Sequence, residues 1–292
     1  MELLKDKVAV ITGGSRGLGL AMAHAFVREG AAVVIASRSA EAVQRAVEEL
    51  KQQGAKVSGL ACDVASYEQV QALADHALAA FGRLDIWVNN AGVAGPYGPT
   101  LGSDPAAFVR VIETNILGVY HGSRAAMLQF MPQGHGKLIN VLGRGYNEPV
   151  PLQNAYASSK AWVYSFTMAL AKETRSSGVG VFALAPGMMT TDLLTEVEVI
   201  EGYEDRLKLM GIIIRMWAKP PAQAAEKTVW LASSATDGKT GKIVKLMGMG
   251  TMLGGALREG LRRLARQAPP TAVNLKVVPS SASSAPKPVG KS

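Results

Sequence analysis

Tyr156 and Lys160 are two residues whose types and spacing could move a proton. They stand four positions apart in a pattern of apolar residues typical of a helix, so both side chains are expected on one helix face. A phenol is a poor acid or base near neutral pH, but a nearby ammonium group favours the phenolate and lowers the pKa. The pair could therefore exchange a proton with a substrate, although this spacing also occurs by chance on many helices.

A glycine-rich segment near the N-terminus, TGGSRGLG at 12–19, could bind a phosphate group. It lies between a short β-branched run at 7–12 and a helical pattern at 18–29. Glycines permit a tight turn and let the backbone approach a pyrophosphate at the helix N-terminus, where N–H groups favour anions. An ordinary tight turn is the simpler interpretation of such a loop, but its position after the first strand favours dinucleotide binding.

The end of the second predicted strand indicates which dinucleotide would bind. A carboxylate there binds the ribose hydroxyls of NAD, whereas a basic residue accommodates the 2′-phosphate of NADP. The strand at 32–36 is followed by Ser37 and Arg38, and Arg16 lies in the glycine-rich segment. Both guanidinium groups could donate to a phosphate dianion, so we expect NADP(H). The alternative is that Arg38 is a solvated residue at the start of the next helix.

Asn89, Asn90, Ala91 and Gly92 follow one another where the fourth predicted strand ends. Small residues there would let the chain pass close to a ribose, and the asparagine side chains could tie neighbouring strands together. A plain Asn/Gly turn is the alternative.

The alternation of strand-like and helical segments along the chain predicts a fold that brings these motifs together. Short β-branched runs alternate with helical patterns, and parallel strands need such long return connections. The predicted strands are 7–12, 32–36, 56–61, 84–89, 137–142, 179–185 and 242–246. The predicted helices are 18–29, 40–52, 67–81, 104–131, 152–177 and 222–234. We therefore expect one α/β domain over 1–250, with a doubly wound parallel sheet covered by helices on both faces.

Four motifs together resemble the signature of the short-chain dehydrogenase/reductase family: TGGSRGLG, NNAG, YASSK and PGMMTT at 186–191. The resemblance covers residues 7–250. It implies a seven-stranded Rossmann sheet and hydride transfer between a nicotinamide cofactor and a carbonyl or alcohol. It also implies a homodimer or homotetramer formed through the two long helices, 104–131 and 152–177.

The functional residues of the family can be carried over by position. Tyr156 resembles the general acid, Lys160 its pKa modulator and nicotinamide-ribose ligand, and Asn115 the proton-relay residue. Asp63 resembles the adenine contact; Asn89, Ala91 and Gly92 resemble the adenosine-ribose neighbourhood, and Pro186, Gly187 and Thr191 the carboxamide site. The full expected cofactor site is Thr12, Gly13, Ser15, Arg16, Gly17, Leu18, Gly19, Ser37, Arg38, Asp63, Val64, Asn89, Ala91, Gly92, Tyr156, Lys160, Pro186, Gly187 and Thr191.

One family residue is missing. The substrate-orienting serine stands thirteen positions before the catalytic tyrosine, and that position is Gly143 here. Losing one such donor can cost on the order of 3 kcal/mol of transition-state stabilisation. A backbone N–H of the turn at 143–145 could replace it, as could Tyr146, Asn147 or Asn154. Alternatively, the substrate is reactive enough not to need the hydroxyl, or the protein is a non-catalytic relative that binds NADP.

This gap resembles the chlorophyll(ide) b reductase branch, which has Gly-x-Gly at this place and a run similar to PGMMTTDLL at 186–194. That branch reduces a formyl group on a large tetrapyrrole with NADPH, and an aldehyde is more electrophilic than a ketone. Our main interpretation is broader, a reductase of an aldehyde or ketone on a bulky apolar molecule. The Met- and Ile-rich segment 188–220 is expected to form a lid over this substrate. The residues expected to contact the substrate are Gly143, Tyr146, Asn154 and Met188.

The composition excludes several other classes of protein. Of 292 residues, 48% are hydrophobic and 18% charged, which indicates a globular core. The single Cys62 excludes a disulfide framework, and the four histidines lack metal-ligand spacing, so no metal is expected. No apolar run approaches the ~18–20 residues of a membrane-spanning helix, and no signal-peptide core is evident, so we expect a cytoplasmic protein.

The net charge of +8 is concentrated in the C-terminal part of the chain, 251–292, which holds seven basic residues and one acidic residue, Glu259. The remainder is nearly neutral and has no nucleic-acid-binding motif, so no nucleic-acid partner is expected. The segment 252–267 has an amphipathic, arginine-rich pattern. It would be either a peripheral membrane helix or a helix docked on its own subunit or a neighbour. Residues 268–292 have the Pro/Ser-rich composition of a disordered tail.

Overall fold

The computed structural model describes residues 2–248, 250, 254, 255, 257, 259, 262 and 271–281. Its centre is a parallel sheet of seven strands in the order β3-β2-β1-β4-β5-β6-β8. The strands are β1 (Val8–Thr12), β2 (Ala32–Ser37), β3 (Val57–Ala61), β4 (Ile86–Asn89), β5 (Gly136–Val141), β6 (Val179–Ala185) and β8 (Lys242–Lys245). The doubly wound sheet and its seven predicted strands are thereby confirmed.

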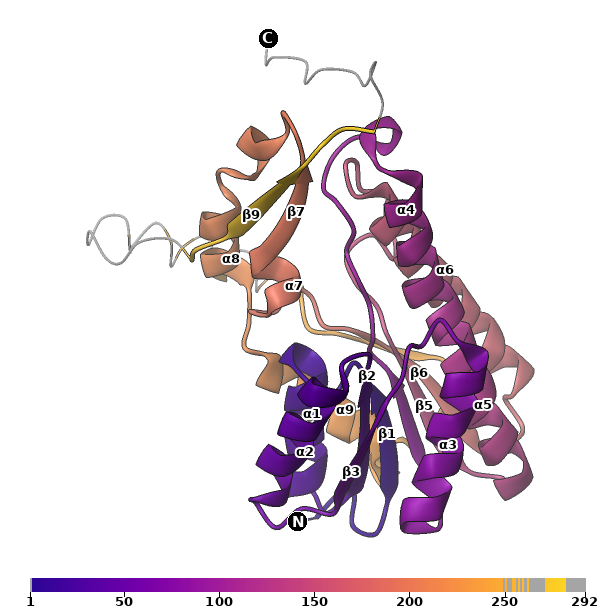
Figure 1. The fold of residues 1–292 in the computed structure, drawn as a ribbon. Coiled ribbons are helices and arrows are strands. Elements are labelled where there is room, and N and C mark those ends of the chain that lie inside the picture. Colours follow the sequence, from indigo (N-terminus) through magenta and orange to yellow (C-terminus); the bar gives the residue numbers. More distant parts are fainter. Residues whose placement is uncertain are drawn as a thin grey trace.

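Helices cover both faces of this sheet (Figure 1). They are α1 (Gly17–Arg28), α2 (Ala40–Lys51), α3 (Tyr67–Phe81), α4 (Pro105–Ile112), α5 (Gly118–Gln133), α6 (Asn154–Glu173) and α9 (Pro221–Ala232). Alternate residues of each strand face opposite layers: Ile11 packs with the core beneath α1, α2 and α9, whereas Val10 packs with the core beneath α3 and α5. Strands buried on both faces explain the continuous apolar runs in the sequence.

The carboxyl ends of the parallel strands meet at one edge of the sheet, and this edge positions the site. Serines begin two of the helices that leave it: Ser39 Oγ accepts from Ala42 N–H at α2, and Ser66 Oγ accepts from Gln69 N–H at α3. Such caps satisfy backbone donors that have no partner inside the helix. The turns at this edge are therefore held in place by local interactions.

The helix predicted over 104–131 contains a wider turn in the structure. Helix α4 passes directly into a π-helical turn, Glu113–Leu117, which continues as α5. Asn115 lies inside this turn and is fully buried. Single π-turns inside longer helices are often found at functional sites, because the extra residue redirects a side chain.

A second, smaller sheet lies beyond the carboxyl edge and was not predicted. It pairs β7 (Glu196–Ile200) in parallel with β9 (Asn274–Val278), and α7 (Asp192–Thr195) and α8 (Met210–Trp217) complete this cap (Figure 1). The prediction of a disordered tail over 268–292 is therefore wrong at β9. Lys276 Nζ lies 2.8 Å from Glu198 Oε1 across the two strands, so the pairing also brings opposite charges together.

Most of the predicted amphipathic segment 252–267 lies outside the described residues, as does 282–292. Within it, Gly254, Gly255, Leu257, Glu259 and Arg262 are helical. The buried Glu259 carboxylate accepts from Arg215 Nε of α8 at 2.9 Å. This contact agrees with a helix docked on its own subunit.

Candidate active site

The glycine-rich loop, residues 12–19, lies where β1 passes into α1. A Cβ at Gly19 would lie within 3 Å of the Gly13 carbonyl group, so a side chain there would prevent the loop from folding back. Asn90 Nδ2 donates to the carbonyl oxygens of Thr12 (3.0 Å) and Gly13 (3.2 Å) and holds the loop. The first N–H groups of α1 have no acceptor within the helix. The loop therefore has a backbone that fits a pyrophosphate group, and the Leu18 side chain packs on the core.

The two arginines expected at a 2′-phosphate have different surroundings. Arg38 follows β2, is exposed, and forms no ion pair with any residue that the structure describes. Arg16 Nη1 lies 3.1 Å from Asp192 Oδ2, at the start of α7. Ser37 Oγ donates to the Ser39 carbonyl group and so orders the turn between them. Arg38 is therefore free to bind an anion, whereas Arg16 joins the loop to the cap.

The Asn89 side chain is buried and bonded within the protein. It accepts from Trp87 Nε1 at 2.8 Å, and donates to Asn140 Oδ1 at 2.8 Å and to Ser123 Oγ at 3.1 Å. These bonds tie β4 to β5 and α5, as predicted for the asparagine side chains of this motif. The residue not predicted is Asn90, whose amide holds the glycine-rich loop; its place in the same NNAG motif was the available signal.

The other predicted adenosine-side residues lie at the same edge. Ala91 N–H donates to Thr12 Oγ1 at 3.1 Å. The Asp63 carboxylate accepts from Ala65 N–H at 3.0 Å, and Val64 is buried beneath α5. Burial raises the pKa of the neighbouring Cys62 thiol to about 11, so this cysteine stays protonated and unreactive.

The three predicted catalytic residues, Asn115, Tyr156 and Lys160, are brought together beside Gly92. A Cβ at Gly92 would lie 3.3 Å from Asn115 Oδ1 and 3.5 Å from Lys160 Nζ. The Asn115 amide exchanges two hydrogen bonds of 2.9 Å with the backbone of Val93, which fixes its orientation. Lys160 Nζ donates to the Val141 carbonyl group at 3.1 Å and lies 5.7 Å from the centre of the Tyr156 ring.

Burial shifts the pKa values of this pair in opposite directions. It raises the pKa of the Tyr156 phenol to about 12 and lowers the pKa of the Lys160 ammonium to about 8, because burial disfavours each charged form. The predicted lowering of the tyrosine pKa by the lysine is therefore not found in this structure. Tyr156 remains a protonated phenol at neutral pH, which is the form that can donate a proton.

The Tyr156 phenol occupies the space that a side chain at position 143 would need. A Cβ at Gly143 would lie 2.9 Å from Tyr156 Cζ and closer still to the hydroxyl oxygen. Gly145 has a φ of 92° and packs on α6, where a Cβ would lie 2.6 Å from Ala157 Cα. Both glycines of the Gly-x-Gly sequence are thus required by the packing of this loop against α6.

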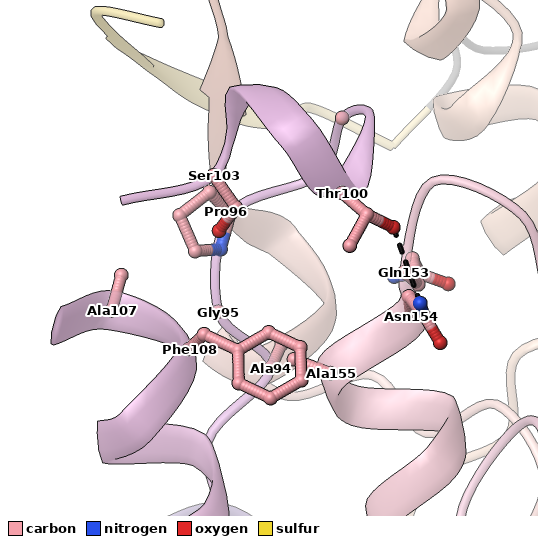
Figure 2. A pocket seen from close by; sticks show the side chains of 11 residues that line it. Ala94, Gly95, Pro96, Thr100, Ser103, Ala107, Phe108, Gln153, Asn154 and Ala155 are labelled. Carbon is pink, nitrogen blue, oxygen red and sulfur yellow. Dashed lines mark hydrogen bonds between the residues drawn. The ribbon is translucent and has the colours of Figure 1, made fainter. Parts of the chain in front are cut away.

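Two of the side chains proposed to replace the serine hydroxyl, Tyr146 and Asn154, have other partners, and Asn147 is exposed. The Tyr146 ring packs edge-on against Tyr164, with the ring centres 5.7 Å apart. Asn154 Nδ2 donates to Thr100 Oγ1 at 3.2 Å, and Figure 2 shows this bond beside a small cavity of about 10 Å³. Neither side chain is shown to reach Tyr156, so the phenol itself is the hydroxyl donor that the structure places at the strand end.

The predicted carboxamide and lid residues begin directly after β6. Pro186 is buried and Gly187 exposed, and the Met188 carbonyl group accepts from Lys219 N–H at 2.9 Å. The Thr191 methyl group lies 3.4 Å from the position of a Cβ on Gly17. The base of the cap therefore lies against the glycine-rich loop.

Within the described part of the chain, no group of three or more His, Cys, Asp or Glu side chains is arranged to hold a metal ion. Among the helices described, none has the length and apolar character needed to cross a bilayer.

This fold, with a nucleotide loop and a Tyr–Lys–Asn site at one sheet edge, defines a nicotinamide-dependent oxidoreductase. Residues 7–200 match the family model of short chain dehydrogenases, and the chain belongs to that family. It is 36% identical over 240 residues to 3beta-hydroxysteroid dehydrogenase 1 of Eggerthella lenta, covering 82% of this chain and 91% of that protein. Over 194 residues it is 40% identical to chlorophyll(ide) b reductase NOL of Oryza sativa subsp. japonica, covering 63% of this chain and 56% of that one.

A solved structure has the same architecture. The 3-ketoacyl-(acyl-carrier-protein) reductase from Brucella melitensis, complexed with NADH, aligns with a TM-score of 0.76 and 31% identity. The alignment covers 99% of that chain but 85% of this one. A nicotinamide cofactor is therefore supported by family and fold, and part of this chain has no counterpart in that reductase.

Proposed function

We propose that this protein uses NADPH to reduce an aldehyde or ketone on a bulky, apolar molecule. The observation that carries the proposal is the Tyr156 phenol, held protonated beside Lys160 and Asn115 and packed against Gly143. A protonated phenol suits the reductive direction, because the product alkoxide needs a proton and is a stronger base than a phenolate. This donor lies next to the loop that fits the pyrophosphate.

Tyr156, Lys160 and Asn115 each have a different role in this reaction. A bound reduced nicotinamide supplies the hydride. Tyr156 donates its hydroxyl proton to the developing alkoxide oxygen, and Lys160 stabilises the phenolate that remains. The Asn115 amide, fixed by its two bonds to Val93, orients the elements that carry Tyr156 and Gly92.

The absence of the serine hydroxyl favours a reactive carbonyl group. With no side chain at Gly143, the substrate oxygen has the Tyr156 hydroxyl as its donor at this strand end. A more electrophilic carbonyl, such as an aldehyde, needs less stabilisation of its developing charge. The second donor can therefore be lost at a smaller cost than for an unactivated ketone.

The preference for NADPH is supported by the end of β2. No carboxylate stands there, and Arg38 is exposed without an ion pair to any described residue. A planar guanidinium group matches a phosphate dianion in two hydrogen bonds. Arg16 could join it, since its bond to Asp192 is an exposed ion pair, and such pairs contribute little stability.

The apolar substrate is supported by the side chains of the cap. Large apolar residues remain solvent-exposed there, including Leu193 (48% exposed) and Leu209 (63% exposed). Exposed apolar side chains that gather in one region often mark a site that binds an apolar ligand. Steroids are one such class, and the similarity to a hydroxysteroid dehydrogenase supports their inclusion in any test.

A formyl group on a tetrapyrrole is a second candidate substrate. It is favoured by the Gly143-Arg-Gly145 sequence, which removes the serine, together with the similarity to the chlorophyll(ide) b reductase NOL. This chain spans about half the length of that relative. Reduction of a formyl tetrapyrrole is therefore a proposal to be tested and not a property inferred from the similarity.

The test is NADPH oxidation by the purified full chain, followed at 340 nm over aldehydes, quinones, steroid ketones and formyl tetrapyrroles. We expect turnover with at least one apolar carbonyl and a loss of about 10³-fold or more in kcat for Tyr156→Phe, which removes the proton donor. Unchanged turnover in Tyr156→Phe would refute the assigned mechanism. Binding of NADPH without reduction of any compound would favour the alternative, a non-catalytic NADP-binding regulatory or scaffold protein.

A further inference from the structure

One serine of α6 is fully buried and has no role in the proposed reaction. Ser159 directly precedes Lys160, and its side chain is 0% exposed. A buried hydroxyl group needs hydrogen-bond partners within the protein, because the loss of its bonds to water is otherwise uncompensated. The partners of Ser159 therefore indicate why a serine stands at this position.

The Ser159 hydroxyl joins the Asn115 amide to the helix that carries Tyr156. Ser159 Oγ accepts from Asn115 Nδ2 at 3.0 Å and donates to the Tyr156 carbonyl group at 2.7 Å. A hydroxyl group has one hydrogen to donate, so the bond to the carbonyl group leaves its oxygen to accept from the amide. In a regular α-helix the same carbonyl group accepts from the N–H of the residue four positions on, which is Lys160. The serine therefore bonds to the turn of α6 that holds the catalytic pair.

Both N–H groups of the Asn115 amide have partners. One donates to the Val93 carbonyl group at 2.9 Å and the other to Ser159 Oγ, while Asn115 Oδ1 accepts from Val93 N–H at 2.9 Å. Asn115 is itself fully buried, so without the serine oxygen one of its N–H groups would lose its acceptor. The serine thus allows the amide to bond to Val93 and to α6 at the same time.

These bonds join three elements that are far apart in the sequence. Val93 lies in the loop after β4, Asn115 in the π-helical turn and Ser159 on α6, with Val93 and Ser159 22 and 44 positions from Asn115. The loop after β4 also holds Gly92, where a Cβ would lie 3.5 Å from Lys160 Nζ. The spacing between this loop and the catalytic turn of α6 is therefore fixed through Asn115 and Ser159.

We propose that Ser159 is a positioning residue: through Asn115 and Val93, its hydroxyl holds Tyr156 and Lys160 at the distance from the Gly92 loop that proton donation requires. The inference rests on the proposed reductase function, in which the Tyr156 hydroxyl must reach the substrate oxygen. Ser159 itself contacts neither substrate nor cofactor and acts through the Asn115 amide and the Tyr156 backbone. A displacement of ~1 Å at a reacting group can cost ~100-fold in rate, so a smaller shift is enough to lower kcat.

Two other hydroxyl groups on α6 provide matched controls. Thr167 is also fully buried and has the same kinds of bond: its Oγ1 donates to the Val163 carbonyl group at 2.6 Å and accepts from Asn140 Nδ2 at 2.9 Å. It lies about two turns beyond Ser159 and does not bond to Asn115. Ser158 is exposed, and its Oγ donates to the Asn154 carbonyl group at 2.7 Å. Thr167→Val removes a buried hydroxyl of the same kind, and Ser158→Ala removes the neighbouring one.

The kinetic test uses the full chain, NADPH and the compound reduced fastest among decanal, a steroid ketone, a quinone and a formyl tetrapyrrole. Ser159→Ala should lower kcat about tenfold and change KM and the Kd of NADPH by less than about twofold, because it leaves the binding surfaces intact. Thr167→Val and Ser158→Ala should keep kcat within about twofold of the wild type, although Thr167→Val should also lower Tm.

A double variant tests whether Ser159 acts through Asn115. In the Asn115→Ala background the bond to the serine is already lost, so Ser159→Ala should change kcat by less than about twofold. A tenfold loss that persists in this background would overturn the inference. An equal loss of kcat in Thr167→Val would also overturn it, because any buried hydroxyl of α6 would then have the same effect.

Hydrogen–deuterium exchange separates the failure of this inference from the failure of the proposed function, because it needs no substrate. In the full chain, Ser159→Ala should accelerate amide exchange in the segments that contain Val93 and Asn115, and Thr167→Val should not. This result without reduction of any carbonyl compound would support the link and contradict the reductase function. Unchanged exchange in both segments would overturn the inference, and wild-type kcat in Ser159→Ala would overturn it while leaving the reductase function intact.

Discussion

Gly143→Ser restores the side chain that the family pattern has at this position, and we expect it to lower activity. A Cβ there would lie 2.9 Å from Tyr156 Cζ and 3.2 Å from Lys160 Cγ, whereas ordinary contacts begin at 3.4 Å. The tyrosine ring must therefore move by about 0.5 Å or more, and its hydroxyl, which is nearer still, by more than that. Overpacking of this size costs ~1–3 kcal/mol, and a displacement of ~1 Å at a reacting group can cost ~100-fold in rate.

Two measurements check this prediction. Steady-state NADPH oxidation should show kcat/KM reduced by roughly 10- to 100-fold in Gly143→Ser. Gly143→Ala is the matched control, since it adds the same Cβ without a hydroxyl, and it should lose a similar amount. Thermal unfolding should show a lower Tm for both variants.

A double variant isolates the contact itself. In the Tyr156→Phe background the hydroxyl oxygen nearest to position 143 is gone, so Gly143→Ala should destabilise that protein less than it destabilises the wild type. The reasoning would be refuted if Gly143→Ser raised kcat/KM above that of the wild type while Gly143→Ala did not. A serine hydroxyl would then be accommodated, and the phenol would not lie where the structure places it.

Three further predictions concern the cofactor, the catalytic lysine and the assembly. Arg38→Ala should weaken NADPH binding by about tenfold or more and NADH binding little, as measured by fluorescence titration. An equal loss of affinity for both cofactors would contradict the assignment of Arg38 to the 2′-phosphate. The pKa of Lys160 is about 8 in the folded protein and about 10.5 in the unfolded chain, so between these pH values the unfolded chain binds more protons. The free energy of unfolding should therefore rise between pH 8 and 10.5, by up to about 3 kcal/mol. Urea unfolding of the cofactor-free protein between pH 8 and 9.5 should show this rise, and the rise should be absent in Lys160→Met; above pH 10 the raised pKa of Tyr156 acts in the opposite direction. On α5, Tyr120 and Leu128 are 43% and 50% exposed, and we expect a homo-oligomer to bury them, so Leu128→Glu should reduce the mass measured by light scattering, whereas an unchanged mass would exclude this face.

The sequence by itself determined the central sheet and the main features of the site. Strands buried on both faces are continuous apolar runs, and amphipathic helices repeat at fixed spacing, so both are visible in short windows of sequence. The glycine-rich loop follows β1 directly, and Tyr156 and Lys160 lie one turn apart on α6, so local spacing was enough to predict them.

Only the tertiary structure decided how distant segments meet. Strand β9 pairs with β7 although paired residues are 78 positions apart in the sequence. Neither short strand has a sequence pattern from which its partner strand could be predicted. Likewise, the inward direction of Asn89, the contact between Gly143 and the Tyr156 phenol, and the upward shift of the tyrosine pKa all depend on burial by neighbours far along the chain. Local periodicity shows which residues form an element and which face is buried, but long-range packing sets the desolvation and the close contacts that give this site its chemistry.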